Sequence, residues 1–335
     1  MFDIISIGDA TIDTFLFIKD LEIREMGGEQ KAVINWGDKL PVDKLYKSVA
    51  GNAANHAVGS SRLGLKTAFY TVFAHDMGGR EVLHKMQKEG VSTRYIEKND
   101  RHGTNASMVL CHEGERTIYV YHEHRHYKLP NFLPARWVYL TSMGKGFEKI
   151  YKDLVRYLEK YDVRLAFNPG TYQLLAGPKA NRKVLEKTDL LSLNMEEAEG
   201  WVGKADSVKE LCRRLVALGP KAVTVTDGPR GAYSYSSEGF YFTQKFPGKR
   251  LEATGAGDSF TTAYIAALVY GLPHAEALRW GPVNAASVVG QIGPQAGLLT
   301  KAELQSRLKT HKSFQPVAIT DSQKEKLVAR LAREI

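Results

Sequence analysis

The most constraining feature of this sequence is the alternation of short apolar runs with amphipathic segments. The runs Phe2–Ile7, 163–167 and Ala222–Thr226 are apolar almost throughout, as expected for strands that are buried on both faces. Another short strand is predicted at 190–193, and helical spacing of apolar residues marks the segments 52–63, 78–89, 146–160, Met195–Val202 and 207–218. This alternation favours a mostly parallel sheet covered by helices on both faces, with ligands bound beyond the carboxyl ends of the strands.

Composition narrows the class of protein further. The 335 residues, 43% of them hydrophobic, suffice for one large α/β domain or for a core domain with a small appendage. The net charge of +9 comes from lysines and arginines scattered along the chain, which favours anionic small ligands and argues against nucleic acid as a partner. No apolar stretch approaches about 18 residues, so no membrane span is predicted. Because Cys111 and Cys212 lack metal-binding spacing and the chain opens on a strand pattern, we expect free buried thiols in a cytoplasmic protein.

Two segments break the alternation. Residues 14–48 and 103–121 contain short β-like runs separated by turns, and neither holds enough apolar residues for a core of its own. We expect them to form one small sheet, a lid over a cleft. The predicted division is therefore a core of 1–13, 49–102 and 127–310, a lid of 14–48 and 103–126, and a helical extension of 311–335 whose amphipathic helix spans 320–335.

A turn of small residues near the C-terminus is the strongest single indication of chemistry. Gly255, Ala256 and Gly257 precede a helical pattern, so their N–H groups and the first helical turn can approach an anion closely. Asp258 follows directly. It can remove a proton from a hydroxyl that attacks a phosphoryl group held by those N–H groups, or it can simply cap the helix. The spacing alone leaves both interpretations open.

Together with four further motifs, this turn resembles the signatures of the PfkB family, the ribokinase-like carbohydrate kinases, over about residues 2–310. The stretch 252–260 is similar to the family's C-terminal signature, and the other matching stretches are 8–13, 50–55, 194–197 and 225–231. The resemblance implies a ribokinase-like three-layer α/β/α domain with a mostly parallel central sheet and a small β-sheet lid. It also implies ATP-dependent transfer of the γ-phosphoryl group to a hydroxyl of a sugar or nucleoside. A phosphosugar kinase, or a catalytically silent sugar- or nucleotide-binding regulator on the same fold, is the alternative.

The resemblance assigns residues to the acceptor side of the site. A carboxylate can accept hydrogen bonds from hydroxyl groups of the acceptor, and two carboxamides can both donate to and accept from such groups. These residues, with their neighbours, are Asp13, Thr11, Gly51, Asn52 and Asn55. The alternatives are that Asp13 caps a turn and that the asparagines cap a helix. Thr11 stands where ribokinases usually carry asparagine, which argues against ribose as the particular acceptor.

The resemblance also assigns residues to the nucleotide side. They are Asn194, Thr226, Gly228, Gly231 and Asn284, while Glu197 is expected to hold Mg²⁺, through water. The spacing of Asn194 and Glu197 fits a helix capping box equally well, and the 226–231 loop fits a simple glycine turn. Glu252 replaces the aspartate that relatives carry near a monovalent-cation site, so binding of a monovalent cation stays open.

Two surface features complete the sequence predictions. The run 122–126 contains three alternating histidines, which suits a transition metal on a strand, a substrate contact by Arg125 or a histidine, or a solvated rim. The lid segments alternate apolar and polar residues, and Phe15, Phe17, Ile118 and Val120 are candidates for buried faces. Because so small a sheet is marginal alone, we expect a homodimer formed through the lid.

Overall fold

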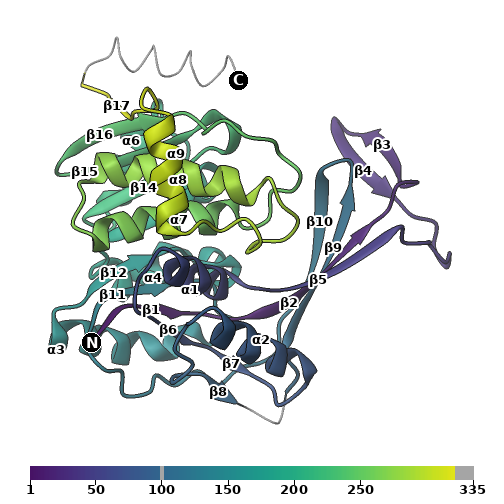
Figure 1. The fold of residues 1–335 in the computed structure, drawn as a ribbon, viewed down its shortest axis with the longest axis horizontal. Helices are drawn as coiled ribbons and strands as arrows, with labels where there is room; N and C mark the ends of the chain where they lie inside the picture. Colours follow the sequence, from purple (N-terminus) through teal and green to yellow (C-terminus); the bar gives the residue numbers. More distant parts are fainter. Residues whose placement is uncertain (99–101, 321–335) are drawn as a thin grey trace.

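A nine-stranded sheet forms the centre of the molecule in this computed structural model, which describes residues 1–98 and 102–320 (Figure 1). The strand order is β17-β16-β15-β14-β13-β12-β11-β1-β6. All neighbours from β14 to β6 pair in parallel, and β15, β16 and β17 continue the sheet antiparallel. The strands are β1 (Phe2–Ile7), β6 (Thr67–Tyr70), β11 (Ala135–Leu140), β12 (Arg164–Phe167), β13 (Leu190–Asn194), β14 (Ala222–Thr226), β15 (Ala232–Ser236), β16 (Gly239–Thr243) and β17 (Val317–Ala318).

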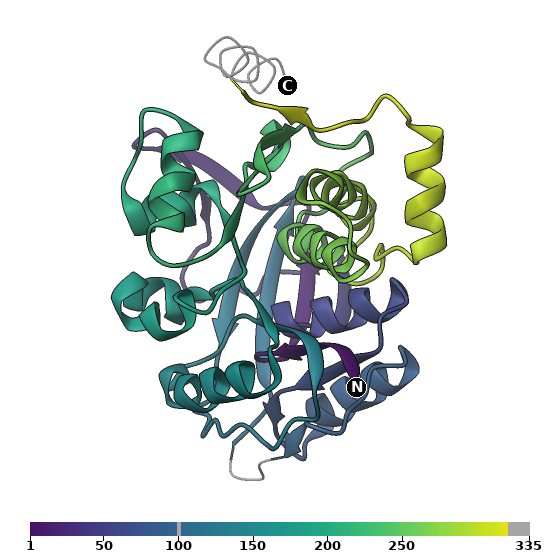
Figure 2. The same cartoon turned by 90° about the vertical axis from the view of Figure 1, so that its left-hand side faces the viewer.

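Helices cover both faces of this sheet, as the two orthogonal views show (Figures 1 and 2). One face buries a core against α3 (Tyr151–Tyr161), α4 (Thr171–Leu185), α5 (Met195–Val202) and α6 (Val208–Val216). The other packs against α7 (Ala256–Val269), α8 (His274–Val288) and α9 (Lys301–Thr310), with α1 (Asn52–Arg62) and α2 (Met77–Lys88) at the β6 end. The predicted three-layer α/β/α fold with a mostly parallel sheet is confirmed. Within the described ranges, no helix is long and apolar enough to cross a membrane.

A second, four-stranded sheet projects from this body (Figure 1), and we call it the lid sheet. Its order is β10 (Glu115–Tyr121), β9 (Asn105–His112), β2 (Thr11–Phe17) and β5 (Lys44–Ala50). The two sequence segments expected to share a sheet therefore do pair, through β2 and β9 in parallel. The strands β3 (Glu22–Met26) and β4 (Glu29–Val33) depart from that expectation, because they form a separate, exposed hairpin with few apolar side chains to bury.

Smaller elements differ from the sequence predictions at their boundaries. The helix expected over 146–160 is divided into a 3₁₀ turn, η1 (Phe147–Ile150), and α3, and its first residue, Gly146, is instead a left-handed cap before η1. Another short turn, η2 (Gly228–Arg230), follows β14, and the pair β7 (Val72–Phe73) and β8 (Glu97–Lys98) lies beside α2. The helix predicted over 320–335 falls almost entirely outside the described residues.

Candidate active site

The first turn of α7 places Asp258 inside the protein. The N-cap of this helix is Gly255, whose φ of +80° is left-handed, and it contributes no side-chain cap. Asp258 is the third helical residue, so the alternative that it serves as the N-cap does not hold. Its carboxylate is 9% exposed and accepts a hydrogen bond from Asn55 Nδ2 at 2.8 Å. Burial raises the pKa of Asp258 to about 6, and the bond from Asn55 opposes that shift.

A second carboxylate faces the same region from the lid sheet. Asp13, on β2, is buried, and one of its oxygens, Oδ1, has no hydrogen-bond partner. Burial raises the pKa of Asp13 to about 6, hydrogen bonds from Ser107 and Thr11 oppose the shift, and repulsion from Glu252 and Asp258 adds to it. An unpartnered buried carboxylate oxygen costs free energy unless a ligand donates to it. The predicted acceptor residue Asp13 is therefore placed close to Asp258, with free accepting capacity.

A third buried carboxylate, Asp9, was missed by the sequence reasoning. Its Oδ2 accepts bonds from the Tyr127 hydroxyl at 2.7 Å and from the Gly144 amide at 2.9 Å, while Oδ1 has no partner. Arg125 lies near it, 4% exposed, with Nη2 3.3 Å from Asn105 Oδ1. The Nε and Nη1 atoms of Arg125 also lack partners. Polar atoms of both signs thus line the body side of the lid sheet.

The three histidines of residues 122–126 were expected to share one face of a strand, and the structure does not place them on one. The strand β10 ends at Tyr121, and the residues that follow belong to no strand, although burial still alternates from residue 124 to 128. His122 is half-buried with its Nδ1 3.9 Å from Asp9 Oδ2, whereas His124 and His126 are exposed. Among residues 1–98 and 102–320, no three His, Cys, Asp or Glu side chains are grouped to hold a metal.

A cavity of about 480 Å³ opens at the start of α7. Six of the predicted residues line it, from three separate parts of the chain: Ala256, Gly257, Asn194, Thr226, Gly228 and Gly231. Further lining comes from Phe246, Phe260 and Pro282 and from the basic Lys245, Arg250 and Arg116, which the sequence reasoning did not assign. The predicted phosphate turn and the predicted nucleotide loops therefore border one cavity.

Asn194 and Glu197 form the capping box that the sequence left as an alternative. The Glu197 amide donates to Asn194 Oδ1, and the Asn194 amide donates to Glu197 Oε2, both at 2.9 Å. Burial raises the pKa of Glu197, and repulsion from Asp258 contributes to the rise. A carboxylate bonded to Asn194, which lines the cavity, fits a hydrated Mg²⁺, because that ion prefers hard oxygen ligands and retains water.

Three other predicted residues, Asn284, Gly51 and Asn52, do not line this cavity. Asn284 was expected at the nucleotide, but its side chain is fully buried, donating to the Ser259 carbonyl and accepting from the Leu299 amide. Gly51 has a φ of +98°, and a Cβ there would lie 2.5 Å from the Asp9 carbonyl oxygen, so a chain crossing requires this glycine. Asn52 is half-buried as the first residue of α1.

Two ion pairs connect the lid sheet to the body. Arg116 of β10 lies 3.6 Å from Glu252, and the neighbouring Glu115 lies 3.3 Å from Arg250. Glu252 is 4% exposed and accepts bonds from both the amide and the hydroxyl of Thr254, directly before the α7 turn. The lid tip is thus held against the segment that leads into the candidate anion site.

The three-layer body with its small lid sheet has the ribokinase fold. The structure of Arabidopsis thaliana ribokinase complexed with ribose and ATP superposes with a TM-score of 0.77 at 19% identity, covering 92% of this chain and 99% of that one. The nucleoside kinase of Methanocaldococcus jannaschii gives a TM-score of 0.73 at 18% identity, with 93% and 99% covered.

The sequence comparison identifies the family. Residues 4–301 match the profile of the pfkB family carbohydrate kinases, and the chain belongs to that family. It is therefore a phosphotransferase that acts on a sugar hydroxyl. The chain is 26% identical to the 5-dehydro-2-deoxygluconokinase of Bacillus licheniformis, over 91% of this chain and 95% of that protein. It is 24% identical to the ribokinase of Bacillus subtilis, with 77% and 87% covered.

Proposed function

We propose that this protein is an ATP-dependent sugar kinase in which Asp258 is the general base. The observation that carries the proposal is the position of Asp258: it is buried in the first turn of α7, beside the open Gly257 backbone of the cavity and close to Asp13. In this arrangement the acceptor lies between the lid sheet and Asp258, and the nucleotide lies in the cavity.

Different residues of the site have different roles in the proposed reaction. Asp13 and Asp9 accept hydrogen bonds from acceptor hydroxyls through their unpartnered oxygens. Asp258, ionised above about pH 6, takes the proton of the attacking hydroxyl at its carboxylate. The N–H groups of the α7 start stabilise the charge on the phosphoryl group during transfer. The lid sheet excludes water, which would otherwise compete as an acceptor.

Mg²⁺ fits this site through Asn194, which lines the cavity, and through Glu197, which is hydrogen-bonded to Asn194 and feels the charge of Asp258. When bound, the ion offsets phosphate charge, which the cluster of carboxylates here would otherwise repel. A monovalent cation near Glu252 is not required by the arrangement, because Arg116 already places a positive charge beside that carboxylate.

The test is ADP release with MgATP and a panel of acceptors. Similar proteins include ribokinase and 5-dehydro-2-deoxygluconokinase, so the panel contains pentoses, hexoses, sugar acids, sugar phosphates and nucleosides. At least one acceptor should stimulate ADP release, and Asp258→Asn should lower kcat at least ~10²-fold while calorimetry shows ATP still bound. Exposed Asp206→Asn is the charge-matched control. A silent regulator would bind a panel member without stimulated turnover, and an Asp258→Asn variant with over half of the wild-type kcat would exclude Asp258 as the base.

We also propose that the enzyme is a homodimer that works in the cytoplasm. Phe15 is buried within the lid sheet, but Ile118 and Val120, which were expected on buried faces, are exposed in the single chain. Tyr119 and Tyr121 of the same strand are exposed as well, which leaves apolar area on both faces of β10. A second copy would cover it. The two buried, unpaired cysteines fit a reducing compartment.

A further inference from the structure

A chain of hydrogen bonds leads from the candidate base to a distant loop. Asp258 Oδ2 accepts from Asn55 Nδ2 at 2.8 Å, and Asn55 Oδ1 accepts from Gln295 Nε2 at 3.0 Å. All three side chains are buried, with Gln295 only 2% exposed. An ionised carboxylate can only accept hydrogen bonds, so Asn55 must present its NH₂ group to Asp258 and its oxygen to Gln295.

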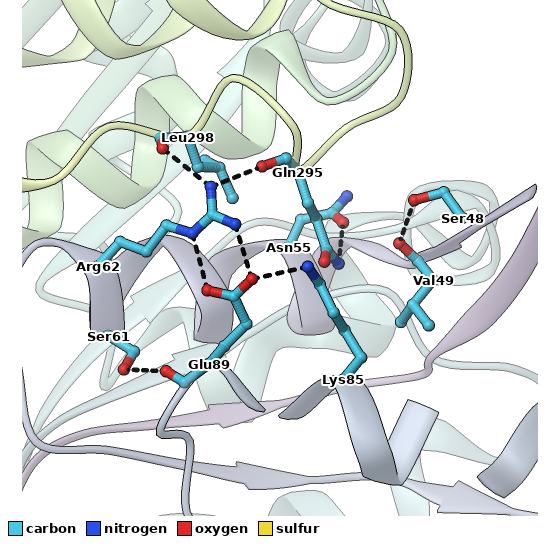
Figure 3. Close-up of polar contacts among 9 residues, drawn as sticks. All are labelled: Ser48, Val49, Asn55, Ser61, Arg62, Lys85, Glu89, Gln295 and Leu298. Atoms are coloured by element: carbon cyan, nitrogen blue, oxygen red, sulfur yellow. Dashed lines mark hydrogen bonds and ion pairs between the residues drawn. The ribbon is translucent and has the colours of Figure 1, made fainter. Parts of the chain in front are cut away.

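The loop that carries Gln295 is fixed by an arginine from the same helix as Asn55. Arg62 Nη1 donates to the carbonyls of Gln295 and Leu298, both at 3.0 Å (Figure 3). Its Nε and Nη2 atoms bond the Glu89 carboxylate at 2.8 and 2.7 Å, and Lys85 joins Glu89 at 2.7 Å. Since Asn55 and Arg62 are two helical turns apart, one face of α1 holds both the base and the loop.

The same loop also touches the candidate anion site. Pro294 lies so close to Gly255 that a Cβ on the glycine would be 2.6 Å from the proline Cβ. At the end of the loop, the Leu299 amide donates to Asn284 Oδ1 at 3.0 Å. The loop therefore contacts both the turn that precedes Asp258 and, through Gln295, the hydrogen-bond partner of Asp258.

We propose that Gln295 is a positioning residue for the general base: its NH₂ group holds the Asn55 amide in the orientation that donates to ionised Asp258, and Arg62 holds Gln295 in place. This inference rests on the proposed role of Asp258. Without the Gln295 donor, the Asn55 amide can rotate and present its oxygen to Asp258, an arrangement that requires a protonated carboxyl. The consequence is a base that ionises only at higher pH.

A substitution at Gln295 leaves the other ionisable groups around Asp258 in place. Asp13 of β2, Glu197 of α5 and Tyr139 of β11 interact with it electrostatically, while Glu252, beside Arg116, interacts with Asp13. None of them bonds Gln295 in the described structure. A shift in the ionisation of Asp258 caused by a change at Gln295 therefore reports on the Asn55 contact.

The test is the pH dependence of kcat in Gln295→Met, which keeps the side-chain length but removes the donor. We expect the acidic limb to move up by about one pH unit, with kcat near the wild-type value once pH exceeds the new limb. Gln291→Met, an exposed glutamine in the same loop, should leave the profile unchanged. A uniform loss of kcat with an unmoved limb would overturn the proposal, because that is what a purely structural role predicts.

A second measurement is made on the wild-type protein and does not depend on the stability of Gln295→Met. In wild-type protein with ¹⁵N-labelled asparagine, the Asn55 side-chain NH₂ signal, identified by its loss in Asn55→Asp, should change with the same midpoint as Asp258. A signal that is constant from pH 5 to pH 8 would overturn the proposal. If this signal titrates but the kcat limb persists in Asp258→Asn, the contact exists and the proposed general-base role fails instead.

Discussion

Removing the buried charge of the candidate base should make the protein more stable while it lowers kcat at least ~10²-fold. Burial raises the pKa of Asp258 from 3.8 to about 6, so the folded protein binds this proton more tightly than the unfolded chain does. The associated stability is fully present below pH 3.8, and it is lost as pH rises through about 6. At about 1.4 kcal/mol for each pKa unit, the ionised carboxylate costs the folded state about 3 kcal/mol above that pH.

Asp258→Asn keeps the shape and an oxygen that can accept from Asn55, but it carries no charge. At pH 8 the variant should therefore gain about 3 kcal/mol in free energy of unfolding. With an unfolding entropy of ~2.1 cal/mol/K per residue, that gain corresponds to a rise in Tm of about 4 °C. The same comparison at pH 4 should show a gain of only about 0.6 kcal/mol, or less than about 1 °C in Tm.

The measurement is calorimetric or fluorescence melting of both proteins, without ligands, across pH 4 to 8. Exposed Asp206→Asn removes one negative charge elsewhere and should change Tm little at any pH. A Tm difference that does not vary with pH, or a variant that is less stable at pH 8, would show that burial does not destabilise the ionised form of Asp258.

Three further results are expected. Asp13→Ala should raise KM for the acceptor about tenfold or more and leave KM for ATP unchanged, since hydrogen bonds to a charged group are worth ~1.5–3 kcal/mol; equal changes in both constants would contradict its placement. Arg116→Met should leave buried Glu252 without its cation and lower kcat/KM about tenfold, with partial recovery in Arg116→Lys, and unchanged kinetics would show that the lid contact is dispensable. Tyr119→Lys combined with Val120→Lys should convert a dimer into a monomer in sedimentation; a wild-type monomer of 37.3 kDa with full activity would exclude the lid dimer.

Patterns among neighbouring residues were sufficient to predict the fold class and several helices of this protein. The alternating segments indicated the three-layer fold, and α5 was predicted with its observed ends, Met195 and Val202, because a strand end, a capping pair and a glycine are all adjacent in the sequence. The start of α7 was predicted two residues late. A left-handed glycine serves as its N-cap, and the sequence offered Asp258 as a more typical capping residue.

Contacts between distant segments could not be predicted in the same way. Asn55 and Gln295 are 240 positions apart, and no periodicity connects them. The Arg116–Glu252 pair depends on how the lid sheet folds over the body, which turn signals do not specify. Asn284 was misplaced because a buried carboxamide that ties two segments together has the same local sequence appearance as one that faces a ligand.

At Gly51 the lid sheet meets the body of the protein in a tight crossing of two backbone segments. The chain enters the sheet through Asp9 and Ala10 and leaves it through Gly51, and at that point the two backbones touch. This crossing lies between two of the proposed acceptor-binding residues, with Asp9 on one side of it and Asp13 on the other. A rotation of the lid sheet about this crossing would change the separation of these two carboxylates, so we expect acceptor binding and lid closure to be coupled. The exposed β3–β4 hairpin lies at the outer end of the lid (Figure 1), so we expect substitutions there to leave acceptor binding unchanged.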